Sequence, residues 1–140
     1  MIDDNLVSRK LKFLSEYFVE LEKIFSDSTD EEVLTDSLKY HAVERLFQLL
    51  VDTMIDINIH VIRGKNVAPP DDLESTFITL GKGGVLPEDF SVKIAPVVGL
   101  RNRVVHRYES LNRMEFIVAC RKNLSDFKKF YNYIAGLLKG

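Results

Sequence analysis

The sequence predicts an all-α fold: an antiparallel four-helix bundle with an additional short helix. Two observations favour this class. Apolar residues recur at intervals of three and four over most of the chain, whereas no segment alternates apolar and polar residues for long, as a strand would. Residues typical of helix starts also precede the long periodic segments: Asp3 or Asp4, Thr29, Pro87 and Asn112. The 140 residues are the length of one domain, so we expect a single domain over residues 1–140.

The first half of the chain predicts two long helices. The first is expected to end near Phe25. Thr29 with Glu32 three residues later fits a capping box, and the helix that it opens is expected to run unbroken to about Val61 or Ile62. Apolar residues cover more than one face of this second helix, which predicts burial on more than one side. We expect it to be the central helix of the bundle or also to form part of a homodimer interface.

The second half predicts a short helix and then two longer ones. The short helix is expected to start at Asp71, and residues 81–84 to end it. This glycine-rich turn lacks the Gly-x4-Gly-Lys-Ser/Thr pattern of a phosphate-binding loop. The next helix starts at Pro87, and Pro96 and Gly99 inside it predict a kink or tight packing. A last amphipathic helix follows from Asn112.

Composition excludes several classes of protein. No apolar run approaches the roughly 18 residues that a membrane helix needs, and the polar, acidic N-terminus does not resemble a signal or transit peptide. The single cysteine, Cys120, excludes an internal disulfide framework and is expected to be a small core residue. We therefore expect a cytoplasmic protein with no membrane association.

Charge is unevenly distributed along the chain. The net charge of −2 predicts no polyanion partner by itself. Residues 1–100, however, carry 10 Lys and Arg against 18 Asp and Glu, whereas residues 101–140 carry 9 against 3. A positive C-terminal quarter attracts phosphates. The alternative is that its lysines are the solvated face of the last helix.

The segment from residue 99 to residue 108 carries the candidate chemistry. Arg101 and His106 interrupt an otherwise apolar helix. Histidine exchanges a proton near neutrality, and arginine grips phosphate oxygens while staying charged. RNA supplies its own nucleophile, the 2′-OH, so cleaving it needs no metal. The histidines His41, His60 and His106 are scattered, and we expect neither a metal site nor a cofactor.

The residues alone leave the role of this segment open. Asn102 and His106 are four apart and share a helix face. An arginine and a histidine five apart are common by chance, and His106 and Arg107 would also suit the C-terminus of a helix through its dipole. Four polar residues of the second helix are either packing residues or the lining of a cleft: His41, Glu44, Arg45 and Gln48.

The pattern Arg101-x4-His106-x-Tyr108, with Asn102 after the arginine, resembles the signature of the HepT-like branch of the HEPN superfamily. Residues 40–48 and the apolar helix after them resemble the second helix of that family, and residues 77–87 and 112–133 resemble its middle segment and last helix. The resemblance implies an HEPN-like all-α homodimer in which the motifs of both subunits lie by a cleft. Arg103 and Arg107 are further candidates to line that cleft.

The activity that the resemblance implies is metal-independent RNA cleavage by the toxin of a toxin–antitoxin pair. His106 would be the general acid and base, Arg101 the phosphate ligand and Asn102 an orienting residue, and the substrate would be a tRNA or an mRNA. A minimal nucleotidyltransferase antitoxin, MntA-like, would silence the toxin by transferring AMP from ATP to Tyr108. The alternative is a non-catalytic all-α dimer that binds a nucleotide or RNA and partners a nucleotidyltransferase.

Overall fold

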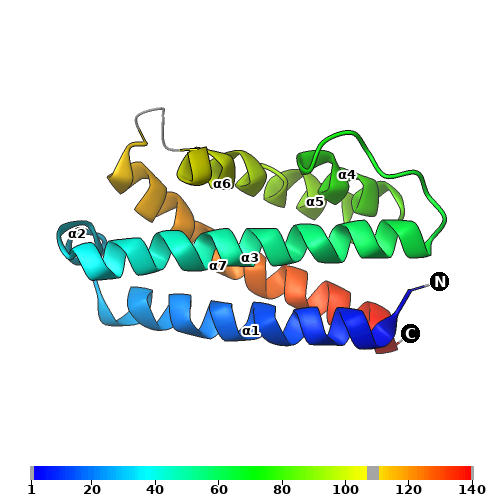
Figure 1. Cartoon of the computed structure of the whole chain (residues 1–140), viewed down its shortest axis with the longest axis horizontal. Helices are drawn as coiled ribbons and strands as arrows, with labels where there is room; N and C mark the ends of the chain where they lie inside the picture. Colours follow the sequence, from blue (N-terminus) through cyan, green and yellow to red (C-terminus); the bar gives the residue numbers. More distant parts are fainter. Residues whose placement is uncertain (1, 107–110, 140) are drawn as a thin grey trace.

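The computed structural model describes residues 2–106 and 111–139, and within these ranges the secondary structure is entirely helical. Three long helices and a row of short ones make up the fold (Figure 1). The long helices are α1 (Asp4–Asp27), α3 (Ser37–Gly64) and α7 (Arg113–Lys139). The short helices are α2 (Asp30–Thr35), α4 (Glu74–Lys82), α5 (Glu88–Ile94) and α6 (Val97–His106). The predicted all-α class is confirmed.

Helix α3 is the centre of the fold. It packs against α1 on one side and against α4 and α6 on the other, and it also touches α7 (Figure 1). The chain direction reverses between α1 and α3, between α3 and α6, and between α6 and α7, so these neighbours are antiparallel. Contacts on several sides explain why apolar residues surround most of α3. The predicted central position of this helix is therefore confirmed.

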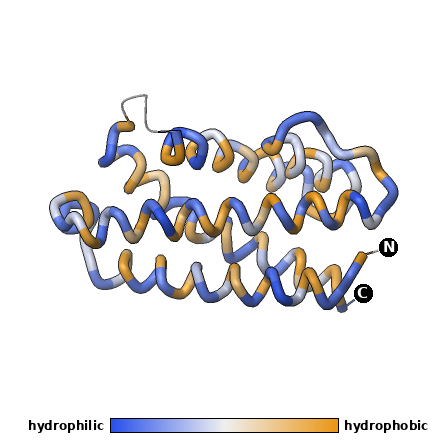
Figure 2. Tube along the Cα trace, viewed as in Figure 1, coloured by the Kyte–Doolittle hydropathy of each residue, from blue (hydrophilic) through white to orange (hydrophobic). Residues whose placement is uncertain are grey.

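Aromatic side chains fill the space between α3, α4 and α7. The ring of Phe47 meets those of Phe116 and Phe127, with centroids 5.3 and 5.9 Å apart, and Phe77 meets Phe130 at 5.8 Å. All five are buried. Hydrophobic residues recur every three or four positions along each long helix, with hydrophilic residues between them (Figure 2). This core fixes how α7 lies across α3.

The expectation of one unbroken helix after Thr29 is wrong, because the chain leaves helical geometry at Asp36. The capping box itself is present: Thr29 accepts from the backbone of Glu32, and the Glu32 carboxylate accepts from the backbone of Thr29. That second bond lowers the pKa of Glu32. Asp36 then has extended backbone, with φ −101° and ψ 106°. Its carboxylate accepts from the backbone N–H groups of Leu38 and Lys39, so α3 has its own N-cap.

The fourth long helix of the expected bundle is two short helices. The break falls at Ala95 and Pro96, between α5 and α6, because proline has no N–H to donate to the helix ladder. The predicted kink at Pro96 is confirmed. Gly99 instead lies inside α6, and a Cβ added there would meet no atom within 4 Å. The expectation of tight packing at Gly99 is therefore wrong.

The short helix before this pair starts later than Asp71. Helix α4 begins at Glu74, after a turn in which the Asp72 carboxylate accepts from the backbone and hydroxyl of Ser75. These bonds lower the pKa of Asp72. Gly84 has a positive φ of 77°, which supports the predicted helix stop at this turn. None of the helices within the described ranges is long and apolar enough to cross a bilayer.

Candidate functional site

Helix α6 positions the first half of the sequence motif. Its apolar side chains Val97, Val98, Leu100 and Val104 are buried against the bundle. Arg101 and Asn102 are consequently half-buried at the edge of that contact, whereas Arg103 and His106 are exposed. Arg103 and His106 lie in the last turn of the helix, the end at which the helix dipole favours basic side chains. The apolar stripe of α6 thus decides which polar residues reach solvent.

The Arg101 side chain is held by two hydrogen bonds. Its Nε donates to the Asp52 Oδ1 on α3 at 2.7 Å, and its Nη1 donates to the Asn102 Oδ1 at 2.9 Å. The ion pair with Asp52 is only partly exposed, the side chains retaining 21% and 33% of their accessible surface. Arg101 is therefore tied both to the neighbouring helix and to its own. The hydrogen bond from Arg101 Nη1 to Asn102 Oδ1 supports the orienting role expected for Asn102.

Asp52 belongs to a polar stripe on α3. His41, Arg45, Gln48 and Asp52 are spaced four, three and four residues apart, which places them along one face of the helix. His41 and Arg45 are exposed, and Gln48 is half-buried. Because Asp52 meets Arg101, this face adjoins α6. Three of the four cleft residues predicted on this helix therefore share a face with the partner of Arg101.

Glu44 differs from the rest of that predicted group. It retains only 5% exposure, and its Oε1 lies 3.2 Å from the His41 Nδ1. The structure thus places Glu44 among buried residues rather than on the solvent-facing stripe. Nearby, the guanidinium of Arg113 at the start of α7 lies 4.5 Å from the ring centroid of Tyr40. The contact between Arg113 and Tyr40 joins the N-terminal end of α3 to the start of α7.

The second half of the motif is only partly described. His106 is the last residue of α6 and is exposed. It is five residues from Arg101, about 140° around an ideal helix. The predicted AMP acceptor Tyr108 and the cleft candidate Arg107 lie outside the described residues.

Asp52 is the residue that sequence reasoning missed. It lies in an apolar stretch of the second helix, and its spacing from His41, Arg45 and Gln48 was the available clue. An acid at that spacing predicts a partner on a facing helix. The identity of the partner depends on how α6 packs, which the spacing does not give.

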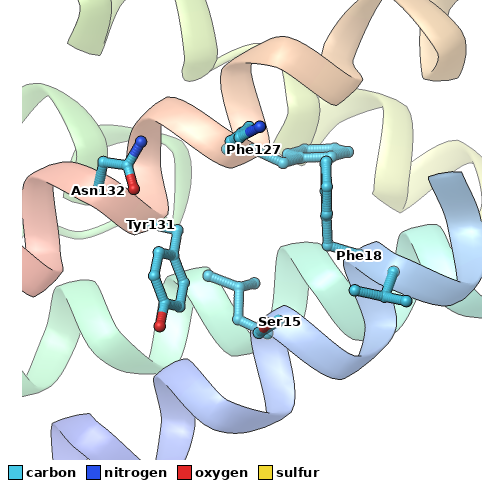
Figure 3. Close-up of a pocket in the computed structure, with 8 residues that line it drawn as sticks. Ser15, Phe18, Phe127, Tyr131 and Asn132 are labelled. Carbon is cyan, nitrogen blue, oxygen red and sulfur yellow. The ribbon is translucent and has the colours of Figure 1, made fainter.

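Two hollows on the surface are relevant to this site: one borders α6, and the other lies away from α6, between α1 and α7. A shallow groove of about 520 Å³ lies between α6 and α7 and includes Pro96, Gly99, Arg103 and Asn123. A second hollow, of about 260 Å³, lies between α1 and α7; Figure 3 shows Phe18 and Ser15 of α1 facing Phe127 and Tyr131 of α7. Within the described ranges, no group of three or more His, Cys, Asp and Glu side chains is placed to hold a metal ion.

These features define an all-α protein that presents an anchored arginine and an exposed histidine from one short helix. Comparison with known families gives the class a name. The family model described as "Ribonuclease HepT-like" matches residues 14–134. The chain belongs to the HepT-like ribonuclease family, as its motif predicted.

Individual relatives agree with this assignment. The chain is 28% identical over 137 residues to the tRNA nuclease HepT of Aphanizomenon flos-aquae, covering 98% of this chain and 92% of that protein. It is 22% identical over 131 residues to the mRNA nuclease HepT of Shewanella oneidensis, covering 94% and 97%. The structure also resembles the tri-AMPylated Shewanella oneidensis HEPN toxin solved in complex with its MNT antitoxin, with a TM-score of 0.85, 23% identity and 97% and 99% coverage. At that identity the structural likeness establishes the fold.

Proposed function

We propose that this chain is a metal-independent endoribonuclease that acts as the toxin of a toxin–antitoxin pair. The observation that carries the proposal is the Arg101-x4-His106 motif in a chain of the HepT-like ribonuclease family, on a helix that anchors Arg101. Two relatives are nucleases of tRNA and of mRNA. The substrate class is therefore RNA, and the site of action is the cytoplasm, where RNA is translated.

The proposed chemistry uses the 2′-OH of RNA as the nucleophile. His106 accepts the proton of that hydroxyl as its oxygen attacks the adjacent phosphorus. The bond between phosphorus and the 5′-oxygen breaks, and the protonated His106 returns the proton to the departing 5′-oxygen. The products are a 2′,3′-cyclic phosphate and a 5′-hydroxyl. Arg101 binds the non-bridging phosphate oxygens and stabilises the negative charge that builds on them. Asn102 orients Arg101 through the 2.9 Å bond to Nη1.

We further propose that AMP on Tyr108 silences the enzyme. The relative from Shewanella oneidensis was solved as a tri-AMPylated toxin with its MNT antitoxin. A nucleotidyltransferase of that kind would be the partner of this chain. AMP adds bulk and negative charge two residues from His106, and both exclude an RNA phosphate from the site. A homodimer that brings two motifs to one cleft completes the proposal.

Replacing His106 tests the function directly. His106→Ala is expected to slow RNA cleavage by the purified chain at least about 100-fold, the usual worth of a general acid–base group. His60→Ala is the matched control, because His60 lies on α3 near the opposite end of the molecule and accepts from the backbone of Asp3. The control is expected to keep its activity, and circular dichroism to show equal helicity for all three proteins.

The outcomes separate the two classes of function. Cleavage by His106→Ala at the wild-type rate would contradict the assignment of His106. RNA binding by the wild-type chain without any cleavage would favour the non-catalytic binding module.

A further inference from the structure

We propose that Asp52 is a positioning residue for the RNA-cleavage reaction, acting through Arg101. This inference rests on the proposed function and deepens it. The two residues are 49 positions apart in the chain and meet only because α6 packs against α3. Asp52 itself is not proposed to contact the scissile phosphate or its oxygens. It fixes the direction in which the guanidinium points.

The geometry of the contact supports positioning. A guanidinium carries five N–H donors, one on Nε and two on each terminal nitrogen. The Asp52 carboxylate accepts the hydrogen bond from Nε, and the Asn102 Oδ1 accepts one from Nη1. Within the described chain, both donors of Nη2 and the second donor of Nη1 have no hydrogen-bond partner. The inner part of the side chain is thus fixed, while its terminal end can still bind two phosphate oxygens.

The charge of Asp52 has a second consequence. Its carboxylate lies 2.7 Å from the group that must bind an anionic phosphate, so it repels the substrate while it orients the arginine. Loss of Asp52 is therefore expected to lower the catalytic rate and at the same time to tighten RNA binding. A residue with a merely structural role would lower both together as the folded fraction falls.

Helix α3 offers a matched control for Asp52. Asp56 lies one turn further along the same helix and also pairs with a cation from another helix, Lys10 Nζ on α1, at 3.4 Å. It is a carboxylate of the same type on the same face of the helix, but its partner lies on α1 rather than on α6. A change at Asp56 reports the general cost of removing an inter-helix ion pair from α3.

The experiment compares steady-state RNA cleavage by six proteins: wild type, Asp52→Ala, Asp52→Glu, Asp56→Ala, Arg101→Ala and the double variant Asp52→Ala with Arg101→Ala. Asp52→Ala is expected to lower kcat at least about tenfold, because misplaced catalytic groups lose that much or more. Asp52→Glu is expected to recover part of the loss, since it still offers a carboxylate to Nε. Asp56→Ala is expected to stay within about twofold of wild type.

The double variant decides whether Asp52 acts through Arg101. If it does, Asp52→Ala costs nothing further once Arg101 is absent, and the two effects are non-additive. Additive losses would overturn the inference. Unchanged kcat in Asp52→Ala would overturn it as well, as would an equal loss in Asp56→Ala.

A binding measurement keeps the inference separate from the proposed function. In a His106→Ala background, a labelled single-stranded RNA oligonucleotide is titrated by fluorescence anisotropy. Asp52→Ala is expected to tighten binding about threefold when Arg101 is present and to change nothing when it is replaced by alanine. Should wild type fail to cleave RNA, the proposed function fails while this arm still decides the role of Asp52. An unchanged or weakened affinity in the presence of Arg101 would overturn that role.

Discussion

Two arginines of this chain show how differently the same side chain is used. All three guanidinium nitrogens of Arg121 are hydrogen-bonded within the protein. Nε donates to Asp30, and Nη1 and Nη2 donate to the carbonyls of Phe25 and Ser28. It thereby ties the turn after α1 to α7. Arg101 is bonded through Nε and Nη1 alone within the described chain. An arginine held at its inner end and available at its outer end is suited to bind a phosphate.

The proposed switch at Tyr108 has a direct test. The tyrosine hydroxyl is the atom that would accept AMP, so Tyr108→Phe removes the acceptor and little else. We expect the variant to keep cleaving RNA after incubation with ATP and the cognate nucleotidyltransferase, whereas wild type loses activity. Intact-mass spectrometry should show AMP on wild type and none on the variant. Silencing of Tyr108→Phe to the same extent would contradict the assignment.

At the scale of single residues, the sequence was most informative where chemistry is local. The Arg101 and His106 pair could be named because both are unusual in an apolar helix. Cys120 was expected in the core; it is fully buried, and burial raises the pKa of its thiol. The Asp52 partner could not be named, because it depends on which residues of α3 face α6. Contacts between distant segments of the chain are set by packing.

At the scale of elements, the caps account for both the correct and the incorrect boundaries. The capping box at Thr29 and the break at Pro96 are encoded by a few adjacent residues, and both were predictable. The break at Asp36 was missed because apolar periodicity continues across it. An aspartate inside a periodic segment can bond to backbone N–H groups and start a new helix. Asp36 does so twice, with Leu38 and Lys39.

The cap at Asp36 predicts a measurable contribution to stability. Asp36→Ala removes two hydrogen bonds at the start of α3 and is expected to lower the free energy of unfolding by about 1 kcal/mol. Urea denaturation followed by circular dichroism measures this. Asp27→Ala is the control, because among the residues that the structure describes the Asp27 side chain makes only an exposed ion pair, with Lys23. Its effect is expected to be within about 0.5 kcal/mol, and an equal effect of the two variants would contradict the capping role.

At the scale of the whole molecule, the central position of α3 offers a second explanation for its apolar surface besides a dimer interface. Apolar residues around most of this helix suggested either a central helix or a subunit interface. Contacts with α1, α4, α6 and α7 within one chain account for that pattern without a second subunit. The expectation of a homodimer therefore rests on the family resemblance. Several large apolar side chains do remain exposed, among them Leu38 at 85% and Val92 at 62%.

The assembly is tested by multi-angle light scattering. At micromolar concentration the chain is expected to have twice the mass of one subunit, because the proposed cleft is formed by the motifs of two copies. A stable monomer that still cleaves RNA would contradict the two-subunit site, while leaving the roles of Arg101 and His106 to the cleavage assays.

Arg101 and His106 are proposed to cleave RNA with the 2′-OH as nucleophile and without a metal ion. The most direct measurement is RNA cleavage by the purified chain in excess EDTA, with analysis of the product ends. We expect that cleavage persists in EDTA, that the products carry 2′,3′-cyclic phosphate and 5′-hydroxyl ends, and that His106→Ala forms them at least about 100-fold more slowly. Loss of cleavage in EDTA with recovery on adding Mg²⁺, or products with 5′-phosphate ends, would contradict it.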